Sequence, residues 1–399
     1  MGRRVFITVA EVSGDQHAAE LIRKLRALDP QIMIDAIGGP RMKAAGANIL
    51  HESVGAAAMG WRGALRTIEV LRLLRRTRRR YADPNQRPDL HICIDSSGMN
   101  LPFARVAKSM GVPVLYYIAP QLWASREGRM RKLRKYVDRV ACILPFEEKY
   151  FREHGVDATF VGHPLFDQLP QDRGRAPGPH FGTKNVPPVV GIIPGSRKRE
   201  VIDNFPHLLE VADRIQQEFP GARFLIPTTE GAHPIVDEML ARRDSRQFEH
   251  TIDAFDGMMP RCDLCLCKSG TSTLRVAAYG VPMIVVYRVN KLLWHALVRW
   301  LLKTRKIALV NILADNTDLV PEFIPWYGSN EPVIQCALDL LRHPEKLEAQ
   351  RQKLRQFVQT LDRPGASMNA ARLAMKMIDD EHTRRPTFDA KLRPGLSEA

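Results

Sequence analysis

Carboxylate side chains directly follow two short apolar runs in the first half of the chain. Glu11 follows the run Val5–Ala10, and Asp95 follows the run Leu90–Ile94. In open α/β sheets, ligands bind outside the carboxyl ends of the strands. A carboxylate at such a position can act as a general base inside a binding site, so both residues are candidate catalytic groups. For Asp95, capping of the following helix is the alternative interpretation.

Small polar residues continue the first of these motifs. Ser13 and Asp15 follow Glu11, with Gly14 between them to allow a tight turn. Both side chains are common helix caps, and a helical pattern begins at this point. Capping and ligand binding therefore both remain open for Ser13 and Asp15, whereas Glu11 at the strand end has no obvious capping role.

Two turns in the second half have the composition of phosphate-binding loops. Gly195 and Ser196 come shortly after the run Val189–Ile193, and Ser269-Gly270-Thr271 comes after Asp263–Cys267. Backbone N–H groups at the start of a helix, together with the helix dipole, bind phosphate. Arg197 can add a bidentate contact. The two turns together predict a diphosphate site.

Cysteine and histidine give weaker signals. Cys262, Cys265 and Cys267 lack a second pair of ligands nearby, so we expect buried thiols rather than a zinc site. His163 stands in Gly162-His163-Pro164, and it either faces the binding site or belongs to a structural turn.

Two basic segments also carry apolar side chains. Residues 62–80 hold eight Arg and one acid, and residues 288–306 hold six basic residues around Trp294 and Trp300. Basic amphipathic helices with Trp at the boundary suit an anionic membrane surface, and a solvated helix face is the alternative. Nucleic acid is disfavoured, because the sequence has no RRM signature, zinc finger or aromatic-rich stacking surface.

Alternating strands and helices must position these residues. Helical periodicity follows several of the apolar runs, which predicts parallel sheets covered by helices on both faces. The strands are expected at residues 5–10, 32–37, 90–94, 114–118, 140–144, 189–193, 223–227, 263–267 and 283–287. The clearest helices are expected at residues 14–28, 206–219, 333–341, 344–360 and 366–380, with Pro206 in the first turn of its helix.

The segment from Gln168 to Pro188 interrupts this alternation with five Pro and three Gly, as a linker would. We therefore expect an α/β fold of two Rossmann-like domains that face each other across a cleft. Residues 1–170 form the first domain, 171–188 the linker and 189–362 the second domain, and a C-terminal helix and loose tail occupy 363–399.

Length, charge and cysteine content agree with that architecture. The 399 residues suit two domains, and 45% hydrophobic against 26% charged residues is ordinary for a globular protein. The net charge of +15, from 59 Lys and Arg against 44 Asp and Glu, favours an acidic partner such as nucleic acid, anionic lipid headgroups or a phosphorylated substrate. A charge that serves only solubility is the alternative. Six Cys fit a reducing compartment. Glu11 ends the first apolar run too early for a secretory signal, and no stretch is long enough for a membrane span.

These motifs together resemble the lipid-A-disaccharide synthase family, which are glycosyltransferases with the two-domain GT-B fold. The matching motifs occur in family order: Glu11-Val12-Ser13-Gly14-Asp15, Gly38-Gly39-Pro40-Arg41-Met42, Ala58-Met59-Gly60, Ile94-Asp95, Tyr117-Ile118-Ala119-Pro120-Gln121-Leu122-Trp123-Ala124, Leu144-Pro145-Phe146-Glu147, Gly162-His163-Pro164, Pro194-Gly195-Ser196-Arg197, Ser269-Gly270-Thr271, Tyr287-Arg288, Asn311-Ile312-Leu313-Ala314 and Val320-Pro321-Glu322-Phe323.

The resemblance implies an inverting transfer. The family joins UDP-2,3-diacylglucosamine to 2,3-diacylglucosamine 1-phosphate, and it forms a β-1,6 disaccharide and UDP. Asp95 matches the family's candidate base, and Glu11 a further essential position. No metal or other cofactor is expected, because helix N-termini and Arg197 would hold the diphosphate leaving group.

The resemblance also implies the remaining site residues and the partners. The donor side is expected at Gly195, Ser196, Arg197, Ser269, Gly270, Thr271, Arg275 and Asn311. The acceptor or membrane surface is expected at Ser13, Met59, Trp61, Trp294 and Trp300. The protein would lie in the cytoplasm, peripherally on the inner face of the cytoplasmic membrane, and a homo-oligomer is left open.

Several positions depart from the family pattern. Gly98 stands where the family usually has a second Asp, and Arg275 where it has a Glu that commonly contacts the nucleotide ribose in GT-B enzymes. Ser125 and Pro325 replace a Trp and a Gln, and Gly63 lies where an acid is frequent. The alternatives are therefore a paralogous GT-B enzyme with another nucleotide sugar or acceptor, or a non-catalytic lipid-binding relative.

Overall fold

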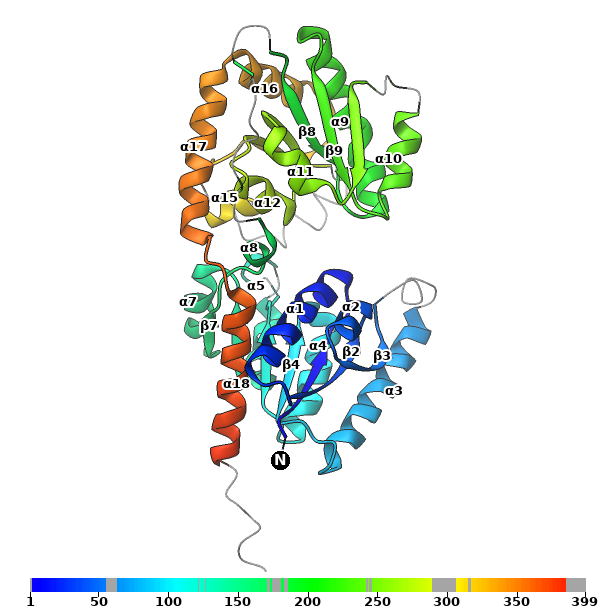
Figure 1. The fold of residues 1–399 in the computed structure, drawn as a ribbon, viewed down its shortest axis with the longest axis vertical. Coiled ribbons are helices and arrows are strands. Elements are labelled where there is room, and N and C mark those ends of the chain that lie inside the picture. The colour runs from blue at the N-terminus through cyan, green and yellow to red at the C-terminus, as the bar shows by residue number, and fades with distance from the viewer. Residues whose placement is uncertain are drawn as a thin grey trace, which may run out of the picture. The chain divides into compact units, whose positions relative to one another are not determined.

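The chain divides into two compact units. Unit 1 comprises Met1–Asp167 and Arg363–Ala399, and unit 2 comprises Gln168–Asp362. The structure is a computed structural model, and each unit can be followed separately in Figure 1. It describes residues 2–54, 63–120, 122–125, 127–170, 173, 181–182, 186–241, 243, 246–288, 306–314 and 317–384.

Unit 1 is built on a parallel sheet of seven described strands. Their order is β3-β2-β1-β4-β5-β6-β7, and every neighbouring pair is parallel. The order reverses between β1 and β4, which is where ligands bind in such sheets. The strands are β1 (Arg4–Thr8), β2 (Met33–Gly38), β3 (Asn48–Glu52), β4 (Leu90–Ile94), β5 (Val114–Tyr117), β6 (Arg139–Cys142) and β7 (Ala158–Phe160).

Helices cover both faces of this sheet, because the central strands are apolar on both sides; all five residues of β4, for example, are buried. Figure 1 shows α18, the last helix in the colour scale, alongside α1, and the two share an apolar cluster that includes Leu21, Leu25, Ala370 and Ile378. The helices are α1 (Val12–Leu28), α2 (Pro40–Ala44), α3 (Gly63–Ala82), α4 (Ser97–Ser109), α5 (Leu122–Ser125), α6 (Met130–Tyr136), α7 (Pro145–Glu153) and α18 (Ala366–Arg384), with α8 (Leu165–Gln168) at the unit boundary.

Unit 2 repeats the plan with six described strands in the order β10-β9-β8-β11-β12-β13, all parallel. Here the order reverses between β8 and β11. The strands are β8 (Val189–Ile193), β9 (Arg223–Thr228), β10 (Phe248–Ile252), β11 (Leu264–Lys268), β12 (Met283–Arg288) and β13 (Glu322–Trp326). The helices are α9 (Lys198–Glu218), α10 (His233–Leu240), α11 (Phe255–Met258), α12 (Ser272–Ala278), α15 (Leu309–Leu313), α16 (Glu331–Arg342) and α17 (Pro344–Leu361).

One predicted helix start is wrong. Pro206 lies inside α9 rather than in its first turn, because the helix begins at Lys198. Val201 and Phe205 are fully buried and extend the apolar face toward the N-terminus. The missing N–H of Pro206 would have bonded the carbonyl of Ile202, which lies on the exposed side of the helix, where water can replace the bond.

Candidate active site

The two candidate carboxylates of unit 1 follow neighbouring strands, at the reversal of strand order. Glu11 follows β1 and is the N-cap residue of α1, with an exposed side chain, and Ser13 is exposed in the first turn of the helix. Gly14 brings α1 against the end of β4, since a Cβ at this glycine would lie 3.9 Å from the Cβ of Asp95. Asp95 therefore lies next to the segment from Glu11 to Gly14, at the carboxyl ends of β1 and β4.

Asp15 caps a helix, although it is not the helix on which it lies. Its Oδ1 accepts hydrogen bonds from the N–H groups of Gly39 and Met42 at 3.1 and 3.2 Å, and its Oδ2 accepts from Arg41 at 3.1 Å. The side chain is buried, and a Cβ at Gly39 would come within 2.6 Å of it. Asp15 therefore stabilises the start of α2.

Asp95 has an unusual backbone conformation. Its φ is 57° and that of Ser96 is 24°, both in the left-handed region that costs a residue with a side chain about 1–3 kcal/mol. Two side chains stabilise it, because the Asp95 carbonyl accepts hydrogen bonds from Tyr116 Oη at 2.6 Å and Asn100 Nδ2 at 2.9 Å. The half-buried carboxylate accepts a bond from Ser96 N–H at 2.7 Å through Oδ1. Among the described residues, its Oδ2 has no hydrogen-bond partner.

A chain of buried hydrogen bonds fixes Asn100 in place. Thr8 Oγ1 donates to Asn100 Oδ1 at 2.7 Å and lies 3.0 Å from His91 Nε2, and Tyr81 Oη lies 2.8 Å from His91 Nδ1. Burial lowers the pKa of His91 to about 3, so the ring is neutral. With the ring proton on Nε2, every group in the chain is satisfied: Tyr81 donates to His91, His91 to Thr8 and Thr8 to Asn100. These positioning residues were not predicted, since nothing in the sequence relates Thr8 and Tyr81 to Asp95.

Two histidines lie in the same part of unit 1. Burial lowers the pKa of His17, and the charges of Asp95 and Asp167 oppose that effect. His163 is buried, accepts a hydrogen bond from Leu165 N–H at 3.2 Å, and has its pKa lowered to about 4 by burial. The His163 side chain therefore forms part of a turn. A structural turn was one of the two interpretations that the sequence left open for this motif.

A buried carboxylate connects two further motifs of unit 1. Glu147 Oε1 accepts a hydrogen bond from Trp123 Nε1 at 3.1 Å, and Oε2 accepts from the N–H groups of Ile143 and Leu144. Burial raises the pKa of Glu147 to about 7, and the three hydrogen bonds act against that rise. The carboxylate thus joins α5 to the start of α7.

In unit 2, a side chain of the following helix, α9, accepts hydrogen bonds from the first Gly-Ser turn. Glu200 Oε2 accepts hydrogen bonds from the N–H groups of Ser196 and Arg197 at 3.2 and 3.4 Å. Gly195 has a φ of 129°, and a Cβ there would lie 2.7 Å from the Cβ of Glu200, so only glycine fits. The side chain of Arg197 is 74% exposed, and its Nη1 lies 3.6 Å from Oε1 of Glu200.

The second turn follows the neighbouring strand, across the reversal of strand order. Ser269, Gly270 and Thr271 lie between β11 and α12, and Gly270 has a φ of 156°. The side chain of Lys268 reaches from the end of β11 to Glu200, with an Nζ–Oε1 distance of 3.0 Å. The two predicted turns are thus adjacent at the carboxyl edge of one sheet.

Arg275 and Asn311 are both engaged within unit 2. Arg275 Nη2 lies 2.7 Å from Asp256 Oδ1. Asn311 is fully buried, and its Nδ2 donates to Val320 O and Glu322 Oε2 at 3.0 and 2.8 Å. Both amide donors of Asn311 are used between α15 and β13, so its contact with a donor sugar stays a prediction.

The remaining sequence expectations divide into two groups. Cys262, Cys265 and Cys267 are buried free thiols, and no metal-binding group of His, Cys, Asp or Glu occurs among the described residues. Met59, Trp61, Trp294 and Trp300 lie outside the described part of the chain, as do residues 289–305 of the second basic segment and 385–399 of the expected tail.

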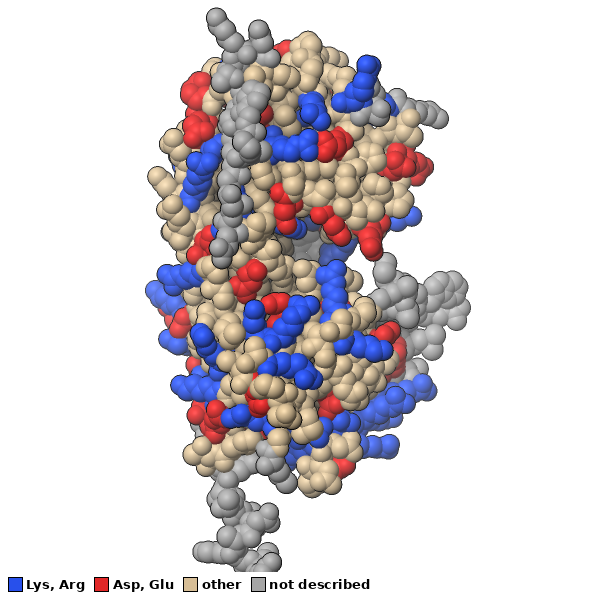
Figure 2. All heavy atoms as spheres, viewed as in Figure 1, with Lys and Arg blue, Asp and Glu red and all other residues tan. Residues whose placement is uncertain are grey.

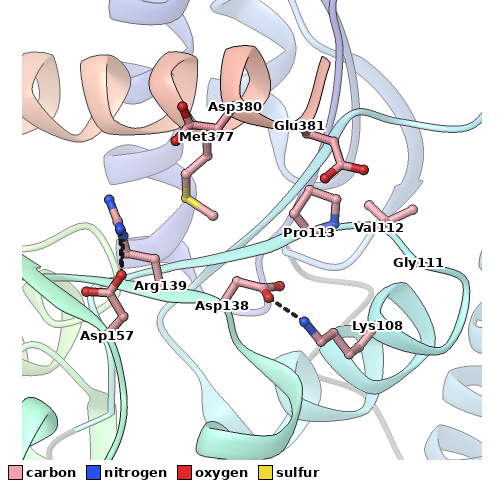
Figure 3. Close-up of a pocket in the computed structure, with 10 residues that line it drawn as sticks. All are labelled: Lys108, Gly111, Val112, Pro113, Asp138, Arg139, Asp157, Met377, Asp380 and Glu381. Atoms are coloured by element: carbon pink, nitrogen blue, oxygen red, sulfur yellow. Dashed lines mark hydrogen bonds and ion pairs between the residues drawn. The ribbon is translucent and has the colours of Figure 1, made fainter. Parts of the chain in front are cut away.

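A separate cavity of about 350 Å³ lies at the amino ends of the unit 1 strands, whereas Asp95 lies at their carboxyl ends (Figure 3). It opens beside the amino ends of β5, β6 and β7. Its cations already have partners, since Lys108 pairs with Asp138 and Arg139 with Asp157. The cavity lies at the strand ends opposite to the one that Asp95 follows.

Comparisons with known proteins show the family to which the chain is related. A sequence model of the family described as "Lipid-A-disaccharide synthetase" matches residues 5–377. The lipid-A-disaccharide synthase of Trichlorobacter lovleyi is 36% identical over 386 residues, which cover 94% of this chain and 98% of that protein. The corresponding enzyme of Nitrosococcus oceani is 35% identical over 383 residues, or 96% of this chain and 98% of that protein.

Solved structures show the fold. UDP-GlcNAc 2-epimerase from Neisseria meningitidis, bound to UDP-GlcNAc, has a TM-score of 0.58 at 11% identity and covers 95% of this chain and 100% of its own. MurG from Acinetobacter baumannii has a TM-score of 0.57 at 16% identity, with 94% and 99% covered. Together with the two parallel sheets, these similarities confirm the predicted α/β fold of GT-B type.

Proposed function

The chain belongs to the lipid-A-disaccharide synthetase family, and from this premise we propose how it carries out its reaction. It is a hexosyltransferase, and it joins a UDP-linked diacylglucosamine to a diacylglucosamine 1-phosphate to give the lipid A disaccharide and UDP. The observation that carries the chemistry is Asp95. Its carboxylate follows β4, where the strand order of unit 1 reverses, and its Oδ2 has no hydrogen-bond partner among the described residues.

Asp95 acts as the general base. Its Oδ2 takes the proton of the acceptor's 6-hydroxyl. At the same time, the oxygen of this hydroxyl forms a bond to C1 of the donor sugar. The bond from C1 to the diphosphate oxygen breaks at the same time, and UDP leaves with that electron pair. The left-handed backbone at Asp95, held by Tyr116 and Asn100, supports this role because it fixes the carboxylate before substrate arrives.

Glu11 and Ser13 position the acceptor. Both side chains are exposed at the start of α1, and Gly14 brings this segment next to Asp95. Glu11 accepts hydrogen bonds from acceptor hydroxyls, whereas Ser13 can both donate and accept. Neither needs to exchange a proton with the substrate.

The turns of unit 2 bind the donor. Negative charge develops on the diphosphate as the C1 bond breaks, and backbone N–H groups of the second turn stabilise it together with the side chain of Arg197. The N–H groups of Ser196 and Arg197 in the first turn are already bonded to Glu200. Gly195, Ser196, Ser269, Gly270 and Thr271 belong to these turns, and Asn311 holds β13 to α15.

The protein associates with an anionic membrane surface on the side of the cytoplasm. Five arginines of α3 with described side chains are exposed and have no ion pair among the described residues: Arg72, Arg75, Arg76, Arg78 and Arg79. Figure 2 shows basic side chains gathered over this helix. No helix in the described part of the chain is long and apolar enough to cross a membrane. Leu71 is 49% exposed on the same helix and adds apolar surface.

Incubation of the full chain with both acylated sugars tests this function. Mass spectrometry of the lipid fraction should detect the disaccharide, and the aqueous fraction should contain one UDP for each disaccharide. An acceptor blocked at its 6-hydroxyl serves as the control. UDP release without a lipid product, or product from the blocked acceptor, would contradict the proposed reaction.

A further inference from the structure

One ammonium group lies between the two phosphate-binding turns of unit 2. Lys268 is the last residue of β11, its side chain is 14% exposed, and its Nζ lies 3.0 Å from Oε1 of Glu200. The other carboxylate oxygen of Glu200 accepts the N–H groups of Ser196 and Arg197 in the first turn. A single carboxylate therefore links the first turn to Lys268.

The same ammonium lies over the second turn. A Cβ built on Gly270 would be 3.9 Å from Nζ of Lys268, so the ammonium lies on the side of Gly270 to which a side chain would project. Nζ also lies 4.8 Å from the centroid of the Tyr287 ring, which restricts it from one side. Glu200 and Tyr287 thus hold the charge beside Gly270.

The negative charge of Glu200 makes the position of the Lys268 ammonium important for a phosphate ligand. Burial alone would raise the pKa of Glu200, but the nearby Lys268 charge and the hydrogen bonds at the turn lower it, so the carboxylate is ionised. An ionised carboxylate beside a phosphate site repels the ligand unless a cation neutralises it. Lys268 supplies that cation at 3.0 Å from Oε1, together with the more exposed Arg197, whose Nη1 lies 3.6 Å from the same oxygen. An ammonium has three donors, and the two that remain after Glu200 have no hydrogen-bond acceptor among the described residues.

We propose that Lys268 binds the diphosphate of the nucleotide-sugar donor through these two remaining donors. Glu200 is then a positioning residue, because it holds the ammonium over Gly270 and does not itself touch the donor. This inference rests on the proposed function, since it takes the donor to bind at this edge of unit 2. It adds to Arg197 a second cation, one that is positioned before the donor binds.

Titration calorimetry of the full chain with UDP and with uridine tests the inference. Lys268→Gln should weaken UDP binding by about tenfold or more, as expected for loss of a charge-assisted hydrogen bond. Uridine, which has no phosphate, should bind this variant as it binds the wild type. Lys268→Arg keeps the charge and should restore most of the UDP affinity. Lys346→Gln, the same change on α17 where Lys346 pairs with Asp339, is the matched control and should leave both affinities unchanged.

Glu200→Gln tests the positioning role. It should weaken UDP binding when Lys268 is present, and it should have no further effect in the Lys268→Gln background, because the two residues act as one unit. Equal effects in both backgrounds, or tighter binding of UDP by the single variant, would overturn the role of Glu200. Thermal unfolding of each variant confirms that the fold is kept.

The outcomes separate this inference from the proposed function. Wild-type chain that binds no UDP overturns the proposed function and the inference with it. Wild-type chain that binds UDP no better than Lys268→Gln does, with uridine equal in both, overturns the inference alone.

Discussion

Arg275 and Asp256 form an ion pair in unit 2, with Nη2 of the arginine 2.7 Å from Oδ1 of the aspartate. The guanidinium also lies over the ring of Phe255, 4.4 Å from its centroid, and Tyr279 Oη donates to the same Oδ1 at 2.8 Å. These contacts hold Arg275 against α11. The family resemblance implies a ribose-reading Glu at this position, and an arginine without acceptors cannot replace it.

The nucleotide should therefore be bound more through phosphate than through ribose. We expect 2′-deoxy-UDP to bind nearly as tightly as UDP, as measured by titration calorimetry. A loss larger than about 1.5 kcal/mol, the size of a good neutral hydrogen bond, would contradict this expectation. In that case Asp256, whose Oδ1 accepts from Arg275 and Tyr279, is a candidate acceptor through its Oδ2, and Asp256→Ala should abolish the discrimination between the two nucleotides.

Asp95→Asn should leave the fold intact and reduce turnover by about 10²–10⁴-fold, because loss of one positioned base has effects of this size. The amide keeps the shape of the side chain but cannot take the acceptor proton. Product formation and the midpoint of thermal unfolding are measured together. Asp237→Asn, on the exposed face of α10, is the matched control. Near-full activity of Asp95→Asn with unchanged thermal stability would remove Asp95 from the mechanism.

Thr8→Val should be destabilising and should also lower turnover. It leaves Oδ1 of Asn100 and a nitrogen of His91 without partners in a buried site, at a cost of about 1–3 kcal/mol in the free energy of unfolding. Asn100 holds the Asp95 carbonyl, so the base is then less well positioned. Thr8→Ser keeps the hydroxyl and should recover most of the activity. If Thr8→Val unfolds at a lower urea concentration but retains full turnover, the hydrogen-bond chain has only a structural role.

Glu147 should make the stability of unit 1 depend on pH. Its pKa is raised to about 7 from an ordinary value of 4.5, so the folded state binds the proton more tightly than the unfolded state. The contribution to stability is complete below about pH 4.5 and is lost as the pH rises through about 7. The shift corresponds to a loss on the order of 3 kcal/mol.

Urea unfolding at about pH 5 and about pH 8 measures this loss. Glu147→Gln should be less stable than the wild type at pH 5, since its single oxygen cannot accept all three hydrogen bonds. Its stability should, however, fall less between the two pH values. An equal fall in both proteins would show that Glu147 does not titrate in this range.

Replacement of arginines on α3 should weaken membrane binding. The double variant Arg72→Gln with Arg79→Gln should float less with vesicles that contain anionic lipid, and the difference should shrink when salt rises from about 0.15 M to about 1 M. Arg355→Gln with Arg372→Gln removes the same charge from exposed positions on α17 and α18 and is the control. Equal flotation of the two double variants would favour a solvated helix face over a membrane surface.

The central strands of both sheets could be predicted from the sequence, whereas the edge strands could not. The predicted runs at residues 90–94 and 189–193 coincide with β4 and β8, which are buried almost throughout. The strands without a prediction, β3, β7, β10 and β13, are those at the sheet edges. Each is partly exposed, and its apolar pattern is correspondingly weak.

The site was predictable to the extent that it lies directly at strand ends. Glu11, Asp95 and the two turns of unit 2 follow strands, and the rule for open α/β sheets locates them. Asp15 illustrates the limit of that rule, because its capping partner is α2, a helix distant in sequence. Lys268 and Glu200 are 68 positions apart, and only the pairing of β8 with β11 brings them together.

The return of the chain to unit 1 at Arg363 has a consequence for biosynthesis. All of unit 2 is translated between the two pieces of unit 1, so it can fold before α18 has been made. Until then the apolar face of α1, including Leu21 and Leu25, lacks the side chains of Ala370 and Ile378. This apolar face of the first piece of unit 1 therefore stays uncovered by α18 while unit 2 is translated, and aggregation of the nascent chain through it has to be avoided during that interval.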